Sequence, residues 1–434
     1  MKLWDKGAGP DKKTDQFTVG QDRELDILLA PYDIMASRAH ALMLGNIGLL
    51  TEAETADLVR ELDTLALAAA QGEFTIEPEF EDMHSKIEYL LTLKLGDTGK
   101  KIHTARSRND QVLVALQLFI KSELQEIQER VNSLFALLMK LAEKHKEVLL
   151  PGYTHLQIAM PSSFGLWFSA YAETLIDDVY LLQAAYRVAD QNPLGSAAGY
   201  GSSFPIDRDF TTQKLGFSAL KVNVVAAQMG RGKVERLTAT ALAGVAATLS
   251  KLAMDVCVYM SQNFGFISFP DKLTTGSSIM PHKKNPDIFE LIRGKCNLIQ
   301  GVPVQLSLLT NNLPSGYHRD MQLTKEVLLP AIESLKSCLE MATDSLQEIQ
   351  VKANILDDSK YDYLFSVDAL NELVNQGMPF RDAYRQMGEA IESKTYVPVK
   401  TAIHTHQGSL GNLCLDRIYK KMEVASRTIE SSED

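Results

Sequence analysis

Residues 109–145 read NDQVLVALQLFIKSELQEIQERVNSLFALLMKLAEKH and contain neither glycine nor proline. Steps of three and four residues alternate along the apolar positions of this run, which are Leu124, Ile127, Val131, Leu134, Leu138 and Leu141. Such spacing puts the apolar side chains on one face of a helix, the pattern of helices that pack into a bundle. We therefore predict one long bundle helix, ended by Pro151-Gly152.

Four further segments have long helical patterns. The first begins at Ser162-Ser163, whose hydroxyls predict an N-cap, and runs to about Ala189. The others cover about residues 234–260, 286–309 and 323–349, with Pro330 as a predicted kink in the last. Helices of this length predict a multi-helix bundle. Their wide apolar stripes predict burial against several neighbours and homo-oligomerisation through the bundle.

The fold class that follows is all-α, with shorter helical patterns on both sides of the bundle. We predict an N-terminal helical domain over residues 1–102, a central long-helix bundle over 103–357 and a C-terminal helical domain over 358–434. A chain of 434 residues is long enough for two or three such domains.

Composition narrows the class of protein. The 45% hydrophobic and 23% charged residues are ordinary for a globular protein, and no apolar run predicts a membrane helix. The polar N-terminus lacks the pattern of a secretory signal, so we expect a cytoplasmic protein. A net charge of −11 argues against nucleic acids and anionic membranes as partners. Four scattered cysteines predict neither disulfides nor a zinc site, and the histidines predict no metal site.

The run GSSIMPHKKNPD at residues 276–287 gathers two hydroxyls, two lysines, an imidazole and an amide. Asn285 favours an N-cap and Pro286 a first helical position, so the run predicts a mobile loop that leads into a helix. The free N–H groups of a helix start suit a bound carboxylate. Ser277, beside Lys283, is a candidate proton acceptor. The alternative is a polar surface loop that contains lysine by chance.

Three more polar clusters lie at predicted helix starts or breaks. HTARSRND at 103–110 forms a carboxylate-binding set of arginines and hydroxyls; the alternative is a capped helix with exposed arginines. GYTHLQ at 152–157 holds a candidate proton donor, His155, or a hydrogen-bonded structural histidine. The weakest cluster lies at 317–325; alone it reads as the solvated entry to a helix.

Together these motifs resemble the aspartase/fumarase superfamily, most of whose members release fumarate from substituted succinates by anti elimination. The 276–286 run matches the superfamily signature. The run HTARSRNDQ at 103–111 is more selective and resembles the argininosuccinate lyase family. Supporting matches are EDMHS at 81–85, YTHLQ at 153–157 and PLGSAAG at 193–199. The resemblance implies arginine and fumarate as products, no metal or organic cofactor, and a homotetramer in which three subunits build each site.

The resemblance also implies residue roles. Ser277 corresponds to the base, while Lys283 and Asn285 hold the carboxylate on which charge develops. His155 corresponds to the general acid, oriented by Glu290. The residues implied in binding the succinate portion are Ser107, Arg108, Asn109 and Thr154. Those implied near the rest of the substrate are Tyr317, Gln322 and Lys325 at its amino-acid end, and His84.

Two departures and three alternatives stay open. Relatives usually carry Gln where this chain has His282, and many carry a substrate-binding Ser where it reads Gln21-Asp22-Arg23-Glu24, so no N-terminal contact is assigned. The run 404–409 is given no role. The alternatives are another fumarate-releasing lyase such as adenylosuccinate lyase, a non-catalytic crystallin-like relative, and an all-helical scaffold.

Overall fold

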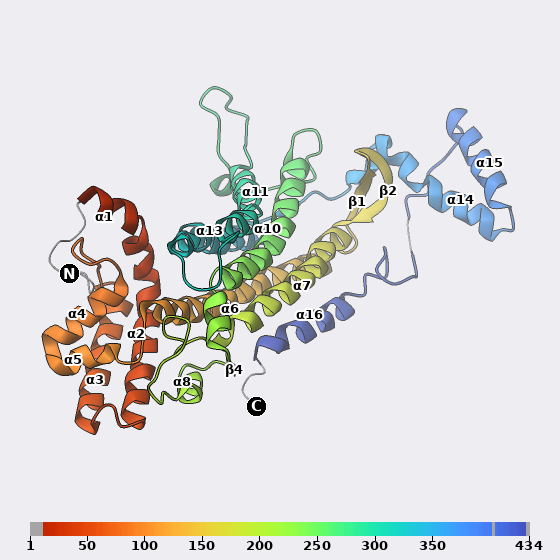
Figure 1. Ribbon diagram of the computed structural model, residues 1–434. Helices are drawn as coiled ribbons and strands as arrows, with labels where there is room; N and C mark the ends of the chain where they lie inside the picture. Colours follow the sequence, from red (N-terminus) through yellow and green to blue (C-terminus); the bar gives the residue numbers. More distant parts are fainter. Residues whose placement is uncertain (1–11, 402–403, 431–434) are drawn as a thin grey trace.

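The computed structural model describes residues 12–401 and 404–430. Its first part is a group of helices that lies beside one end of the long-helix bundle (Figure 1). Thr51 caps the third of them through a capping box with Glu54. The elements are α1 (Lys12–Val19), α2 (Asp22–Asn46), α3 (Glu52–Ala70), α4 (Met83–Leu95), α5 (Asp97–Lys100) and the 3-10 turn η1 (Lys101–His103).

A bundle of long helices forms the centre of the molecule, which confirms the all-α prediction (Figure 1). Its main members are α6 (Arg108–Lys144), α7 (Phe164–Ala189), α10 (Lys233–Met260) and α13 (Leu323–Gln347), with Pro330 inside α13. Ser163 caps α7 as predicted, because its hydroxyl accepts a hydrogen bond from Leu166 N at 3.1 Å.

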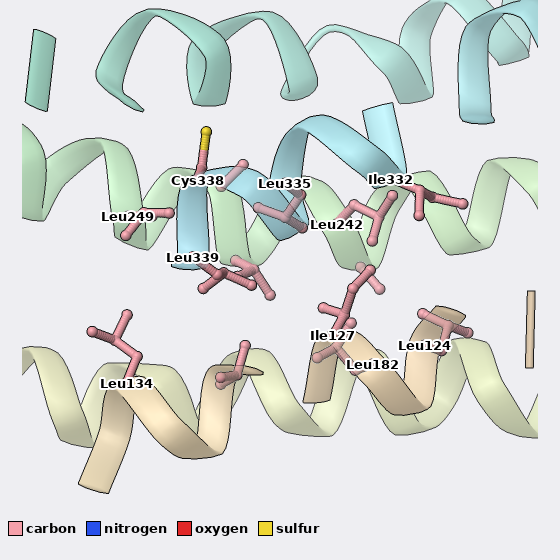
Figure 2. Packing of buried hydrophobic residues seen from close by; sticks show 14 of the residues in the cluster. Leu124, Ile127, Leu134, Leu182, Leu242, Leu249, Ile332, Leu335, Cys338 and Leu339 are labelled. Carbon is pink, nitrogen blue, oxygen red and sulfur yellow. The ribbon is translucent and has the colours of Figure 1, made fainter. Parts of the chain in front are cut away.

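The apolar seam of α6 forms one wall of the core. Leu124, Ile127 and Leu134 are buried and face side chains from three other helices (Figure 2). Those side chains are Leu182 of α7, Leu242 and Leu249 of α10, and Ile332, Leu335 and Leu339 of α13. The three- and four-residue spacing of α6 therefore has the structural meaning predicted from it.

Two local predictions were wrong. The helix predicted from Pro286 to Leu309 is two helices, α11 (Asp287–Ile299) and α12 (Val302–Thr310), interrupted at Gly301. Asn285 does not cap α11; its side-chain amide contacts Thr275 Oγ1 and Gly276 O instead. Because the chain uses Asn285 to close the base of the 276–284 loop, the helix starts one residue later than expected.

The break between α6 and α7 is a β-hairpin, which the sequence reading missed. Strands β1 (Leu149–Thr154) and β2 (Gln157–Ser163) pair antiparallel, with Thr154 opposite Gln157. His155 and Leu156 form the two-residue turn, both at positive φ (53° and 59°), as a two-residue hairpin turn of this kind requires. Strands β1 and β2 lie beyond one end of α7 (Figure 1), and His155 is in the turn that joins them.

Short elements complete the chain. The C-terminal α16 (Leu415–Glu430) returns along α7, and its Met422 and Ala425 join the main core. The three-part domain division stays a prediction. The remaining elements are β3 (Gln191–Asn192), α8 (Arg208–Lys214), β4 (Ala219–Leu220), α9 (Val224–Met229), β5 (Ile267–Ser268), η2 (Asp271–Leu273), η3 (Arg319–Gln322), β6 (Gln350–Val351), η4 (Ile355–Asp357), η5 (Ser359–Phe365), α14 (Ser366–Asn375) and α15 (Phe380–Glu392).

Within the described residues, α10 is the one helix long and apolar enough by composition to cross a membrane. Its apolar side chains have another explanation, because α10 packs against α7, α11, α12 and α13 and its buried face belongs to the core. The helix is thus a core element of the bundle.

Candidate active site

A cavity of about 140 Å³ lies where α2, α4, α6 and α13 meet. It gathers residues that are far apart in the sequence, including six of the nine predicted substrate contacts. Those six are His84, Arg108, Asn109, Tyr317, Gln322 and Lys325. The other lining residues are Asp22, Asp26, Glu81, Asp82, Val112, Arg231 and Arg319.

The start of α6 is fixed by a capping box. Ser107 Oγ accepts from Asn109 N, while Asp110 Oδ1 accepts from Ser107 N at 2.9 Å. Asp110 Oδ2 accepts two more backbone hydrogen bonds, from Gly195 N at 3.0 Å and Ala197 N at 2.9 Å. The buried Asp110 carboxylate thereby ties the 193–199 run to the helix start.

Ser107 thus caps α6 and does not line the cavity, and its role in substrate binding stays a prediction. The companion expectation of exposed arginines was wrong. Arg106 is buried and donates to Ser37 Oγ at 2.9 Å.

Arg108 faces the cavity but is held by carboxylates of its own chain. Its Nη1 lies 3.1 Å from Glu81 Oε2 and its Nη2 lies 2.7 Å from Asp82 Oδ2. Burial lowers the pKa of Arg108, but Asp82 and Glu81 outweigh that effect and the net pKa is raised. The guanidinium is thus a fixed positive charge at the cavity wall.

Lys325 is buried against two acids of α2. Its Nζ donates to Asp26 Oδ1 at 2.6 Å and lies 2.7 Å from Asp22 Oδ1. Nearby, Gln322 donates to the carbonyls of Thr18 and Val19, each at 3.0 Å. Sequence reasoning assigned no role to either acid. The one signal that could have found them is their spacing of four residues, which puts both on one face of α2.

His84 lies at the floor of the same region. Its Nδ1 is 3.0 Å from Asp33 Oδ2, and both side chains are almost fully buried. Burial alone lowers the pKa of His84, but the charge and hydrogen bond of Asp33 more than reverse this, so the pKa is raised. The histidine is therefore favoured in its protonated form.

The hairpin tip places Thr154 and His155 in solvent. Both side chains are exposed, and no hydrogen bond or ion pair from the described residues reaches the His155 ring. Neither residue lines the cavity.

The loop between η2 and α11 holds the remaining candidates. Ser277 Oγ accepts hydrogen bonds from Met280 N at 3.1 Å and Ile279 N at 3.4 Å, so two backbone donors point at this oxygen. Lys283 is exposed, and among the described residues its ammonium has no ion-pair partner. The base of the loop is closed by the bridge between Thr275 and Asn285.

Glu290 lies on the first turns of α11 and is exposed. Within the described part of one chain, no hydrogen bond or ion pair joins Glu290 to His155, or the Ser277 loop to the cavity. Apart from Ser107 at the start of α6, the predicted site residues thus lie in three places: the cavity, the hairpin tip, and the loop with Glu290. Figure 1 shows the β1–β2 hairpin and α11 apart from α2 and α4.

Known proteins resemble the chain along most of its length. A family described as lyase matches residues 11–301. Argininosuccinate lyase of Parabacteroides distasonis is 59% identical over 97% of this chain and 95% of its own length. That of Bacteroides fragilis is 57% identical over 99% and 96%, and that of Thermotoga neapolitana is 42% identical over 89% and 98%.

Solved structures share the fold at lower identity. EDDS lyase in complex with formate superposes with a TM-score of 0.78 at 23% identity, covering 98% of this chain and 91% of that one. Class II fumarase from Schistosoma mansoni gives a TM-score of 0.72 at 17% identity, covering 96% and 95%. Full-length identity well above 30%, the matching lyase family and this shared helical fold lead to one conclusion: the chain belongs to the argininosuccinate lyase family.

Proposed function

We propose that this protein is an argininosuccinate lyase that splits argininosuccinate into arginine and fumarate by anti elimination. The single observation that carries the proposal is identity of 57–59% with argininosuccinate lyases over nearly the whole chain. The cavity supports it, because its paired acids and bases suit a substrate that carries both signs of charge.

Ser277, as its alkoxide, takes a proton from the carbon next to a succinate carboxylate. The negative charge passes to that carboxylate as an aci-carboxylate, which Lys283 and Asn285 stabilise. The carbon–nitrogen bond then breaks, the carbon–carbon double bond of fumarate forms, and the departing guanidinium nitrogen receives a proton from His155. The two backbone N–H groups on Ser277 Oγ support the first step, since they stabilise negative charge on that oxygen.

Ser107, Arg108, Asn109 and Thr154 bind the succinate portion in this proposal. Tyr317, Gln322 and Lys325 bind the amino-acid end, beside His84. Glu290 orients His155. These steps require no metal or organic cofactor, and we propose a cytoplasmic enzyme of arginine biosynthesis.

Each complete site draws on more than one copy of the chain, in a homotetramer. The separation of the cavity, the hairpin tip and the loop supports this arrangement. So do four large apolar side chains left exposed along α11 and α12, Leu291, Leu298, Val304 and Leu308, each at least 60% exposed. Apolar rows of this kind on a bundle face mark contacts between chains.

Two assays test the function. Purified protein is supplied separately with argininosuccinate and adenylosuccinate, and fumarate is followed by its ultraviolet absorbance. We expect fumarate from argininosuccinate alone. Release from adenylosuccinate instead would establish the alternative lyase, which the 106–109 run argues against. Release from neither would establish a non-catalytic relative.

A further inference from the structure

The two acids on Lys325 are not equivalent. Asp26 Oδ1 accepts a hydrogen bond from Lys325 Nζ at 2.6 Å. Asp22 Oδ1 lies 2.7 Å from the same nitrogen, in ion-pair contact but without the direction of a hydrogen bond. No described residue donates a hydrogen bond to Asp22 Oδ2. Asp22 is therefore a cavity-lining carboxylate with unused acceptor capacity.

The local charge balance points to a cationic ligand at this place. The other cavity cations already face acids: Arg108 faces Glu81 and Asp82, Arg319 faces Glu81, and His84 faces Asp33. Arg231 is paired with Glu235, at 2.9 Å. Two carboxylates thus share the single ammonium of Lys325, which leaves one negative charge without a matched partner beside the cavity.

We propose that Asp22 is a specificity-determining residue whose carboxylate binds the α-ammonium group at the amino-acid end of the substrate. This inference rests on the proposed function. The ammonium brings the missing positive charge and hydrogen-bond donors to Asp22. The adjoining α-carboxylate lies toward Tyr317, whose hydroxyl makes no hydrogen bond within the described chain. The subsite therefore selects a ligand end that carries both an ammonium and a carboxylate group over one that carries a carboxylate alone.

The acid–base properties of Asp22 agree with this role. Burial raises the pKa of Asp22 to about 6, with Asp26 adding to the rise and Lys325 opposing it. The charged groups that act on it are Asp26 on its own helix, Lys325 on α13 and Arg231 before α10. Below about pH 6 the protonated carboxyl loses its attraction for an ammonium group, so binding of the amino acid weakens there.

The test runs the reaction in reverse. Wild type and Asp22→Asn are each supplied with fumarate and either arginine or 5-guanidinopentanoic acid, and the loss of fumarate is measured. The second compound has the guanidinium group of arginine but lacks its α-ammonium group. We expect Asp22→Asn to raise KM for arginine about tenfold or more with kcat within about threefold, and to reduce the preference for arginine by a similar factor. KM for 5-guanidinopentanoic acid should stay within about threefold, because it has no group for Asp22 to bind.

Controls separate this role from a structural one. Asp22→Asn should keep the wild-type melting temperature, since it leaves the Lys325–Asp26 pair intact, and it should lose the fall in kcat/KM for arginine near pH 6. Glu24→Gln, an exposed acid on the same helix, should match wild type in all respects. Asp22→Ser gives a second variant if the asparagine protein folds poorly.

An unchanged preference for arginine in both variants would overturn the proposal. So would equal KM increases for arginine and 5-guanidinopentanoic acid, because Asp22 would then act only by holding Lys325. A wild-type protein that adds neither guanidino compound to fumarate would overturn the proposed function itself, which distinguishes the two failures.

Discussion

The cavity and the 276–284 loop both carry predicted site residues, yet they differ in how their charged side chains are held. In the cavity, Lys325 and Arg108 are held by acids of the same chain. In the loop, Lys283 is exposed and has no ion-pair partner among the described residues. The cavity cations are thus preorganised within one chain, whereas Lys283 in the loop and His155 at the hairpin tip have no ion-pair partner among the described residues.

The largest effect should come from the loop. Ser277→Ala removes the proposed proton acceptor, and we expect the rate of fumarate release to fall by about a thousandfold or more. Stability should not change, because the side chain is only half-buried on an outlying loop. Ser278→Ala, at the exposed neighbouring hydroxyl, is the matched control and should retain most of the activity. Equal losses in both variants would remove the base assignment.

Mixing inactive variants tests whether the open regions come from different copies. Ser277→Ala and His155→Asn are each expected to be nearly inactive. If one copy supplies the serine and another the histidine, equal random mixing leaves about a quarter of sites intact, one half multiplied by one half. Activity should reappear after denaturation and refolding of the mixture. A mixture of either variant with the double variant should show no recovery, and absence of recovery in the main experiment would contradict a shared site.

Two lysines give the direct contrast between the regions. Lys325→Met leaves Asp22 and Asp26 buried without a counter-charge, so we expect a loss of about 3 kcal/mol in the free energy of unfolding. Lys283→Met should leave stability unchanged and lower kcat. Chemical denaturation and the fumarate assay measure the two effects. A Lys283 variant that loses stability, or a stable Lys325 variant, would contradict the contrast.

The cavity should also give a pH signature in stability. The raised pKa of His84 means that the folded state holds its proton more tightly than the unfolded state. This stabilisation is fully present below the unfolded pKa of about 6.5 and is lost as pH rises through the higher folded value. The stability advantage of wild type over His84→Gln should therefore shrink as pH rises above about 6.5. An advantage that grows with pH would reverse the assigned direction.

The smallest effect is expected at His282, the exposed loop histidine that replaces the usual Gln. A histidine at this place should make loop ordering modestly dependent on pH, so the pH–rate curves of wild type and His282→Gln should differ slightly. Superimposable curves would remove the idea.

Sequence reasoning reached the elements whose cause is local. The spacing of Leu124, Ile127 and Leu134 determines a helix face whatever the rest of the chain does, and it was read correctly. The β1–β2 hairpin was missed because Pro151 and Gly152 indicate a break without saying what fills it. The interruption at Gly301 was missed as well, because a single glycine in a helical pattern does not show whether the helix continues through it.

The site was predictable in its motifs but not in its neighbours. Asp22 is recognisable as a site residue only through its ion pair with Lys325, about three hundred residues away in the sequence. No local sequence pattern predicts such a pair. The motif likewise did not show that the Ser107 hydroxyl caps α6. The arrangement of the three regions depends on tertiary structure, and their union in the proposed homotetramer would depend on contacts between copies.

The hairpin turn has a consequence for the entropy of assembly. His155 and Leu156 take backbone conformations that L-residues seldom adopt. The strands below them pack on η4 and η5, and the Tyr153 ring contacts Phe264 at 5.6 Å. The backbone of His155 thus loses its freedom when the chain folds. In the proposed homotetramer, only side-chain rotations at the tip would be left to restrict, so association there would cost less entropy than ordering a flexible loop.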